Sequence, residues 1–199
     1  MGKAALERGV LENNACKNVF LPDAEQKEVK YLNNDETVYF IESLNHVPRE
    51  EYNCKVGLLY ALFTSLRKGE LFGLEERDID FESGYITVCR ARYAKTGGGT
   101  YVKRVKSKCS NREVAIPMQL MTETKTLILV NKERQFAMGR KWRESPALFK
   151  GAFGDPMYPN MLYVWLDRFL KKNDFTSFSR QLSKNEEGTL KFQRSVGGE

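Results

Sequence analysis

The segment at residues 58–74, LLYALFTSLRKGELFGL, restricts the fold more than any other part of the chain. Its first half places leucines three and four residues apart, a spacing that predicts a buried helix. The pair Thr64 and Ser65 then interrupts the pattern, because both residues favour turns and helix N-caps. We therefore expect a second short helix over residues 66–74, with Arg67 in its first turn.

Arg67 would place a positive charge at the N-terminal end of this helix, where the helix dipole favours negative charge. Glu70, three residues later, can pair with the guanidinium and orient it toward a second anion. Taken alone, such a pair is more often a structural ion pair at the edge of a core than part of a catalytic site. The segment by itself leaves both interpretations open.

Positive charge is concentrated in residues 83–112. The chain has 199 residues and a net charge of +6, yet this segment holds eight basic residues and no Asp or Glu, which leaves −2 for the rest. Such a local cationic field is expected where a surface meets a phosphate backbone, although a solvated lysine-rich hairpin would have the same composition. The eight residues are Arg90, Arg92, Lys95, Lys103, Arg104, Lys106, Lys108 and Arg112.

The remaining patterns predict an α+β domain that is mainly helical and has a small three-stranded antiparallel sheet. Asn33 and Glu36 form a capping pair ahead of an apolar stripe, and the glycines at 97–99 fit a hairpin turn better than a phosphate-binding loop. His46 is expected to be an ordinary helix-end residue. We expect helices after Asn33 and at residues 52–66, 117–138 and 160–172, and strands near 85–88, 101–106 and 112–117. The predicted core contacts of the helix at 117–138 are Leu120, Leu127, Val130 and Phe136.

Several classes of protein are disfavoured by the composition. The four cysteines match no zinc or redox spacing, so we expect neither a metal site nor a disulfide. No apolar run approaches the ~18 residues of a membrane helix, and the polar N-terminus does not resemble a secretory signal. We therefore expect a cytoplasmic protein without a membrane partner.

These residues, in this order, resemble the tyrosine recombinase (phage integrase) family, most of all the integrases of conjugative transposons and temperate phages. LLYALFTSLRKGELFGL followed by DIDF is similar to the box that carries the family's first catalytic arginine, and VKSKCSNREVAIP resembles the segment with its catalytic lysine. The resemblance implies a core-binding-domain remnant at residues 1–20, a linker at 21–33 and a partial catalytic domain at 34–175. Residues 176–199 match nothing in the family and are expected to be disordered.

The resemblance also implies a chemistry. In this family a tyrosine attacks a DNA phosphate and forms a 3′-phosphotyrosyl link, without metal or cofactor, on double-stranded DNA and together with other integrase subunits. Arg67 would stabilise the charge on the phosphate oxygens, and Glu70 would hold Arg67. Lys106, with Lys108 as the alternative, would protonate the departing oxygen. The expected DNA contacts are Arg90, Arg92, Lys103, Arg104, Lys108 and Arg112.

The sequence departs from the family at three places. Ser65 stands where the family usually has glycine, no histidine follows His46, and no tyrosine follows Tyr163. The family's H-x-x-R motif and its nucleophilic tyrosine are therefore missing. We expect a truncated copy, as a frameshift would produce, that is inactive alone. The alternatives are a non-catalytic DNA-binding or regulatory module and a protein-interaction fragment.

Overall fold

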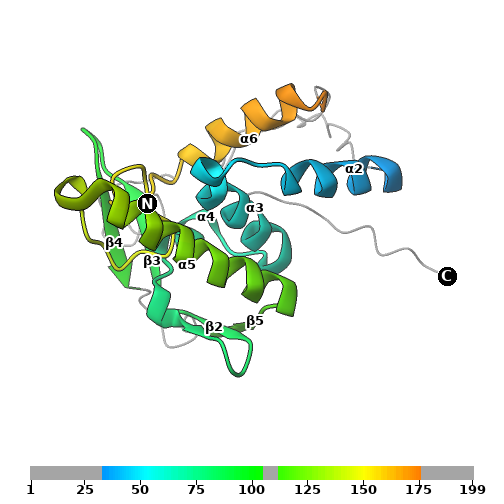
Figure 1. Cartoon of the computed structure of the whole chain (residues 1–199). Coiled ribbons are helices and arrows are strands. Elements are labelled where there is room, and N and C mark those ends of the chain that lie inside the picture. Colours follow the sequence, from blue (N-terminus) through cyan, green and yellow to red (C-terminus); the bar gives the residue numbers. More distant parts are fainter. Residues whose placement is uncertain (1–32, 105–111, 176–199) are drawn as a thin grey trace, which may run out of the picture. The chain divides into compact units, whose positions relative to one another are not determined.

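The structure is a computed structural model that describes residues 33–104 and 112–175. This part of the chain combines five α-helices with short antiparallel strands, which confirms the predicted α+β class (Figure 1). Most of the predicted linker and the segments at 1–20 and 176–199 lie outside the described residues. The helices are α2 (Asn34–Asn45), α3 (Tyr52–Thr64), α4 (Lys68–Gly73), α5 (Met118–Met138) and α6 (Met161–Lys172). Single turns of 3-10 helix lie at Arg49–Glu51, Glu76–Asp78 and Gly139–Lys141.

Helix α2 begins at the predicted capping box. The Asn33 side-chain oxygen accepts a hydrogen bond from the Glu36 backbone N–H at 2.8 Å, and the Glu36 carboxylate accepts one from the Asn33 N–H at 2.9 Å. His46 caps the other end of the helix, with its Nδ1 3.0 Å from the Glu42 carbonyl oxygen. Both ends of α2 are therefore defined by local polar contacts that the sequence predicts.

Helix α3 lies at the centre of the core. Val56, Leu58 and Tyr60 are fully buried, and the helix contacts both α5 and α6. The Tyr60 hydroxyl lies 3.0 Å from the Thr124 hydroxyl of α5, so the one polar atom of this buried ring has a partner. Burial raises the pKa of Tyr60 to about 12. The buried helix predicted for this segment is confirmed.

Helix α5 confirms three of its four predicted core contacts. Leu120, Leu127 and Val130 are buried, but the Phe136 side chain is 87% exposed, so its assignment to the core is wrong. Phe136 follows Leu127 by nine residues, about two and a half turns at 3.6 residues per turn, and therefore points away from the buried face.

The strands form two small sheets rather than the single predicted one. The three-stranded sheet has the order β1 (Ile79–Asp80), β2 (Tyr85–Val88), β5 (Arg112–Ala115), and the two-stranded sheet pairs β3 (Arg90–Ala94) with β4 (Thr100–Arg104). All pairs are antiparallel. The predicted strands correspond to β2, β4 and β5; β1 was not expected, and β3 lies in the segment that leads into the predicted hairpin turn. The turn between β3 and β4 contains the glycines at 97–99, each with positive φ, as predicted.

The β3–β4 hairpin lies against α4. A Cβ atom at Gly73 would stand 2.6 Å from the Arg90 carbonyl oxygen, so only glycine permits this approach of strand to helix. At Gly69, one turn earlier, a Cβ would be 3.4 Å from Ala91. The glycines of α4 thus place the hairpin beside the Arg67 segment.

Within the part of the chain that the structure describes, no helix is long and apolar enough to cross a membrane.

Candidate nucleic-acid interface

Arg67 is the N-cap residue of α4. The turn before Arg67 is made by Ser65, which has left-handed backbone angles of φ 50° and ψ 29°. Glycine adopts such angles without strain, which agrees with the expectation that the family usually has glycine at this position. Leu66 is buried and anchors the turn, whereas the Arg67 side chain is 83% exposed. The turn therefore presents a guanidinium to solvent at the start of a helix whose last four residues, 70–73, are buried.

Glu70 is the buried acid of the site, with only 6% of its side chain exposed. Its Oε2 accepts a hydrogen bond from the Arg67 backbone N–H at 3.0 Å, which caps α4. Its Oε1 lies 3.4 Å from Nη1 of Arg67. Arg112, from the first position of β5, donates to both oxygens, at 3.1 Å to Oε1 and 2.8 Å to Oε2. One carboxylate is thus shared by two arginines.

The environment of Glu70 lowers its pKa. Burial alone would raise the pKa, but hydrogen bonds from Arg112 and from the Arg67 backbone N–H, together with the two positive charges, outweigh burial. The same contact with Glu70 raises the pKa of Arg112. Glu70 is therefore ionised at neutral pH, and the three side chains together carry a net positive charge.

A cleft of about 470 Å³ opens beside Arg67. It lies between the start of α4, the β3–β4 hairpin and the residues before α6, and it is lined by Arg67, Lys68, Gly69, Glu70, Ala91, Arg92, Tyr93, Ala94, Tyr101, Pro159 and Asn160. Tyr93 and Tyr101 face each other across the hairpin with ring centroids 5.7 Å apart, and both are exposed. The cleft therefore combines cationic and aromatic groups, the two kinds that contact phosphates and bases.

Lys68 adds a second cation to the cleft. Its Nζ lies 3.3 Å from the Asn160 side-chain oxygen and 5.1 Å from the centre of the Tyr163 ring. The two contacts tie α4 to the start of α6. The sequence analysis did not predict Lys68, Tyr93 or Tyr101 as residues of the site. The glycine turn was a signal for the two tyrosines, because a hairpin around it places residues 93 and 101 opposite each other.

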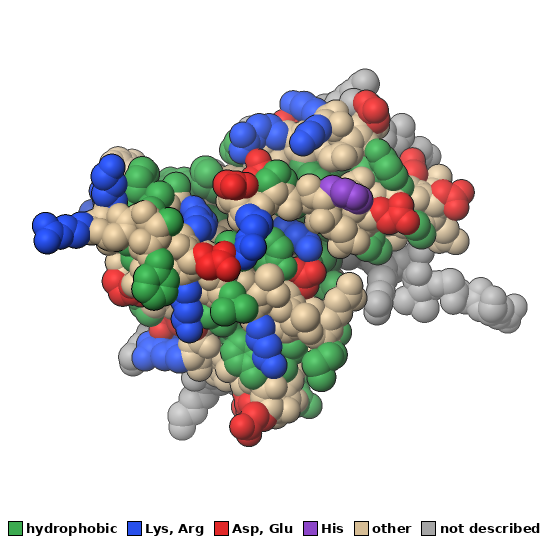
Figure 2. All heavy atoms as spheres, in the orientation of Figure 1, with side chains coloured by type: hydrophobic (Ala, Val, Ile, Leu, Met, Phe, Trp, Pro, Cys, Tyr) green, Lys and Arg blue, Asp and Glu red, His purple; other side chains and the backbone are tan. Residues whose placement is uncertain are grey.

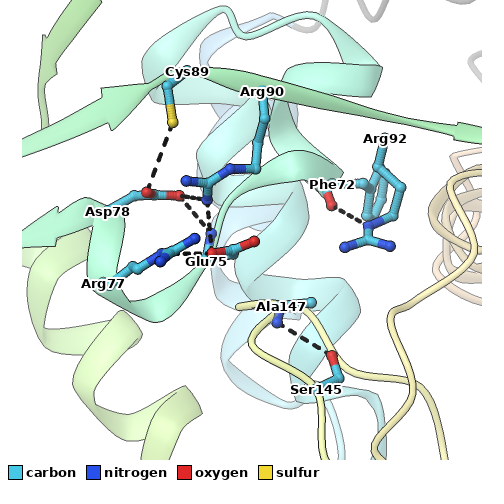
Figure 3. A network of polar contacts seen from close by, with 9 residues as sticks. All are labelled: Phe72, Glu75, Arg77, Asp78, Cys89, Arg90, Arg92, Ser145 and Ala147. Atoms are coloured by element: carbon cyan, nitrogen blue, oxygen red, sulfur yellow. Dashed lines mark hydrogen bonds and ion pairs between the residues drawn. The ribbon is translucent and has the colours of Figure 1, made fainter. Parts of the chain in front are cut away.

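Arg90 makes buried structural contacts (Figure 3). Its Nη1 lies 2.7 Å from Asp78 Oδ2 and 3.0 Å from Glu75 Oε2, and only 13% of its side chain is exposed. Glu75 Oε2 is also 2.7 Å from Arg77, so this oxygen is held by charge proximity rather than by aligned hydrogen bonds. The Arg90 guanidinium is thus shared between two buried carboxylates.

Arg92 is likewise held inside the fold. Its Nε donates to the Phe72 carbonyl oxygen at 3.0 Å (Figure 3). Its Nη1 donates to the Thr100 hydroxyl at 3.1 Å. Burial lowers its pKa. The expectation that Arg90 and Arg92 contact DNA stays a prediction, and both guanidinium groups have intramolecular partners in this structure.

The other predicted DNA contacts have different positions. Lys103 is exposed on β4, with its Nζ 5.4 Å from the centre of the Tyr101 ring. Arg112 contacts Glu70, as described above. Arg104 is the last residue of β4, while Lys106 and Lys108 lie outside the described residues. Figure 2 shows acidic side chains among the Lys and Arg side chains of the face it presents, so the positive charge is not one continuous patch.

In the described ranges, no group of three or more His, Cys, Asp or Glu residues is placed to hold a metal ion.

Comparison with solved structures identifies the fold. The chain is similar to the Tn1549 transposon integrase in complex with transposon right end DNA, with 21% identity and a TM-score of 0.63 over 78% of this chain and 48% of that one. A second structure of that integrase, with circular intermediate DNA, gives 19% identity and a TM-score of 0.67 over 98% and 59%. XerA recombinase gives 15% identity and a TM-score of 0.50 over 72% and 43%.

The fold is therefore that of the tyrosine recombinases, and the similarity includes the integrase of a transposon. The chain spans about half of the length of these integrase structures. No family model and no curated protein sequence matches the chain.

Proposed function

We propose that this chain is the phosphate-orienting part of a tyrosine recombinase that acts in DNA integration, and that it binds double-stranded DNA at the cleft beside Arg67. The observation that carries the proposal is the exposed Arg67 guanidinium, held at the N-terminus of α4 by a buried, ionised Glu70. The fold supports it, because the transposon integrase structures to which the chain is similar are complexes with DNA.

The proposed role of Arg67 follows from its geometry. A planar guanidinium can donate two parallel hydrogen bonds to the two non-bridging oxygens of a phosphate, which an ammonium cannot. Donors that are fixed in advance stabilise the charge that these oxygens gain during phosphoryl transfer. Lys106, or Lys108 in its place, is proposed as the general acid that protonates the departing oxygen.

We further propose that this 199-residue chain does not cleave DNA alone. It contains no histidine after His46 and no tyrosine after Tyr163. The Tyr163 hydroxyl is buried without a hydrogen-bond partner among the described residues, and burial raises its pKa, so this tyrosine is poorly suited to attack a phosphate. Cleavage would require these groups from another integrase subunit, in the cytoplasm where we place the protein.

DNA binding by the Arg67→Gln variant tests the proposal. We expect the purified chain to bind double-stranded DNA with an affinity that falls steeply with salt, and Arg67→Gln to weaken it on the order of tenfold at 0.1 M salt, the loss of about one phosphate contact. Fluorescence anisotropy of labelled duplex DNA measures both.

The matched control is Arg140→Gln, because Arg140 is exposed and lies outside the cleft. It should change DNA affinity much less than Arg67→Gln. Equal losses in the two variants, or no binding by the unchanged chain at low salt, would contradict the proposal and favour the protein-interaction alternative.

A further inference from the structure

Two arginines that are far apart in the sequence share the Glu70 carboxylate unequally. Arg112, 42 residues away, binds it with two parallel hydrogen bonds at 3.1 and 2.8 Å. The Arg67 side chain makes a single contact at 3.4 Å, and the Arg67 backbone N–H a second one at 3.0 Å. A carboxylate offers about four lone-pair positions, so these four contacts fill it.

The arginine that binds Glu70 more closely is also the less exposed of the two. The Arg112 side chain is 39% exposed and the Arg67 side chain 83%. Both terminal nitrogens of Arg112 therefore donate hydrogen bonds to Glu70. The Arg67 guanidinium, in contrast, has N–H donors that contact no other residue in the described part of the chain. If Arg112 were absent, the nearest cation to the buried Glu70 would be Arg67, which stands at the favourable spacing of three residues.

We propose that Arg112 is a positioning residue for the Arg67 site: by occupying both oxygens of Glu70, it prevents the Arg67 guanidinium from closing onto that carboxylate and keeps it available for a DNA phosphate. This inference rests on the proposed function of the cleft. It replaces the expectation that Arg112 itself contacts DNA, and it makes the phosphate site depend on a residue that touches no phosphate.

The salt dependence of DNA binding separates a positioning role from a direct contact. Each phosphate contact contributes about 0.9 to the slope of log affinity against log salt. We expect Arg67→Gln and Arg112→Met each to lower the slope by about 0.9 and the affinity on the order of tenfold at 0.1 M salt. The double variant should lose no more than Arg67→Gln alone, because both substitutions remove the same contact.

A rescue variant excludes a merely structural role. In Glu70→Gln/Arg112→Met the residue at position 70 has no charge to capture Arg67, and its amide oxygen can still accept the Arg67 backbone N–H. We expect this variant to recover most of the DNA affinity that Arg112→Met loses. Arg112→Lys should fall between the unchanged chain and Arg112→Met, because an ammonium cannot occupy both oxygens in the same way. Circular dichroism confirms that each variant is folded.

Two results of the DNA-binding assay would overturn the inference, and a third readout tests it without DNA. A slope reduced by about 1.8 in Arg67→Gln/Arg112→Met means that Arg112 contacts DNA directly. Failure of Glu70→Gln/Arg112→Met to recover affinity means that Arg112 acts only through the fold. The third readout needs no DNA: the side-chain 15N–1H signal of Arg67 should become more rigid in Arg112→Met and return to its original mobility in Glu70→Gln/Arg112→Met.

The third readout also distinguishes the two proposals. If the unchanged chain does not bind DNA, the proposed function fails, and the Arg67 signal still decides whether Arg112 controls that side chain. An Arg67 signal that is unaffected by Arg112→Met contradicts the inference even where DNA binding is intact.

Discussion

At the scale of single residues, the site depends on one acid that the fold keeps ionised. Glu70 has almost no contact with water, but hydrogen bonds from Arg112 and the Arg67 backbone more than compensate for its burial. The sequence predicts Glu70 as the partner of Arg67, and the structure adds Arg112. Sequence alone could not reveal this third member, because it reaches Glu70 only through the pairing of β5 with β2.

Glu70 should make stability depend on pH in the acidic range. Because its pKa is lowered on folding, its contribution is complete above the ordinary pKa of a glutamate, about 4.3, and is lost as the pH falls through the lower pKa of the folded state. Urea unfolding between pH 7 and pH 2.5 measures this loss. Glu70→Gln should flatten that part of the profile. Equal profiles for the unchanged chain and Glu70→Gln would contradict this assignment.

Ser65 stores backbone strain at the turn that delivers Arg67. Its φ of 50° is unfavourable for a residue with a Cβ. Ser65→Gly should therefore stabilise the fold by about 1 kcal/mol, which corresponds to a rise in Tm of about 2–4 °C for a domain of this size. Ser83→Gly, at a turn position without positive φ, should bring no such gain. A lower Tm for Ser65→Gly would show that the serine side chain compensates for the strain.

At the scale of elements, local signals predict the helices well and the strand pairing poorly. The capping pair, the Thr-Ser interruption and the glycine turn each act within a few residues, so helices α2, α3 and α4 and the β3–β4 turn agree with the prediction. The strands divide into two sheets because β2 pairs with β5, which follows the β3–β4 hairpin in the sequence, and not with a strand of that hairpin. Because contacts between residues distant in sequence leave no periodic signal, the prediction failed there.

The same limit applies to the intramolecular contacts of Arg90 and Arg92, which the sequence analysis did not predict. Both belong to the basic segment by composition, but the Arg90 side chain contacts Asp78, in the 3-10 turn after α4, and the Arg92 side chain contacts the Phe72 carbonyl oxygen of α4. Charge counted along the sequence therefore overstated the free cations of the hairpin.

The contact between α4 and β3 gives a prediction about the hairpin. Gly73→Ala should destabilise the fold and weaken DNA binding together, because the new Cβ would stand 2.6 Å from the Arg90 carbonyl oxygen and push the hairpin away from the cleft. Gly57→Ala is the matched control: its Cβ would make ordinary contacts of 3.7 Å with Phe149, and alanine in a helix is favoured by up to about 1 kcal/mol. Thermal unfolding and DNA anisotropy of both variants test this. Similar effects of the two substitutions would mean that the close approach does not position the hairpin.

At the scale of the whole molecule, the fold is that of the tyrosine recombinases, and the sequence has no histidine after His46 and no tyrosine after Tyr163. This fold was predicted from the order of elements and from the resemblance of the Arg67 box and of the segment VKSKCSNREVAIP to the family. The lysine at 106 or 108 and the segment at 176–199 remain predictions, because they lie outside the described residues.

A suicide DNA substrate tests whether the chain as given can cleave DNA. Such a substrate traps any phosphotyrosyl link, because the strand end needed to reverse it diffuses away. We expect no covalent adduct on a denaturing gel, since the chain has no tyrosine after Tyr163 and the Tyr163 hydroxyl is buried. Tyr163→Phe should leave DNA affinity almost unchanged, since the Lys68 ammonium contacts the ring rather than the hydroxyl. An adduct formed by the unchanged chain and absent from Tyr163→Phe would show instead that α6 opens to expose a nucleophile.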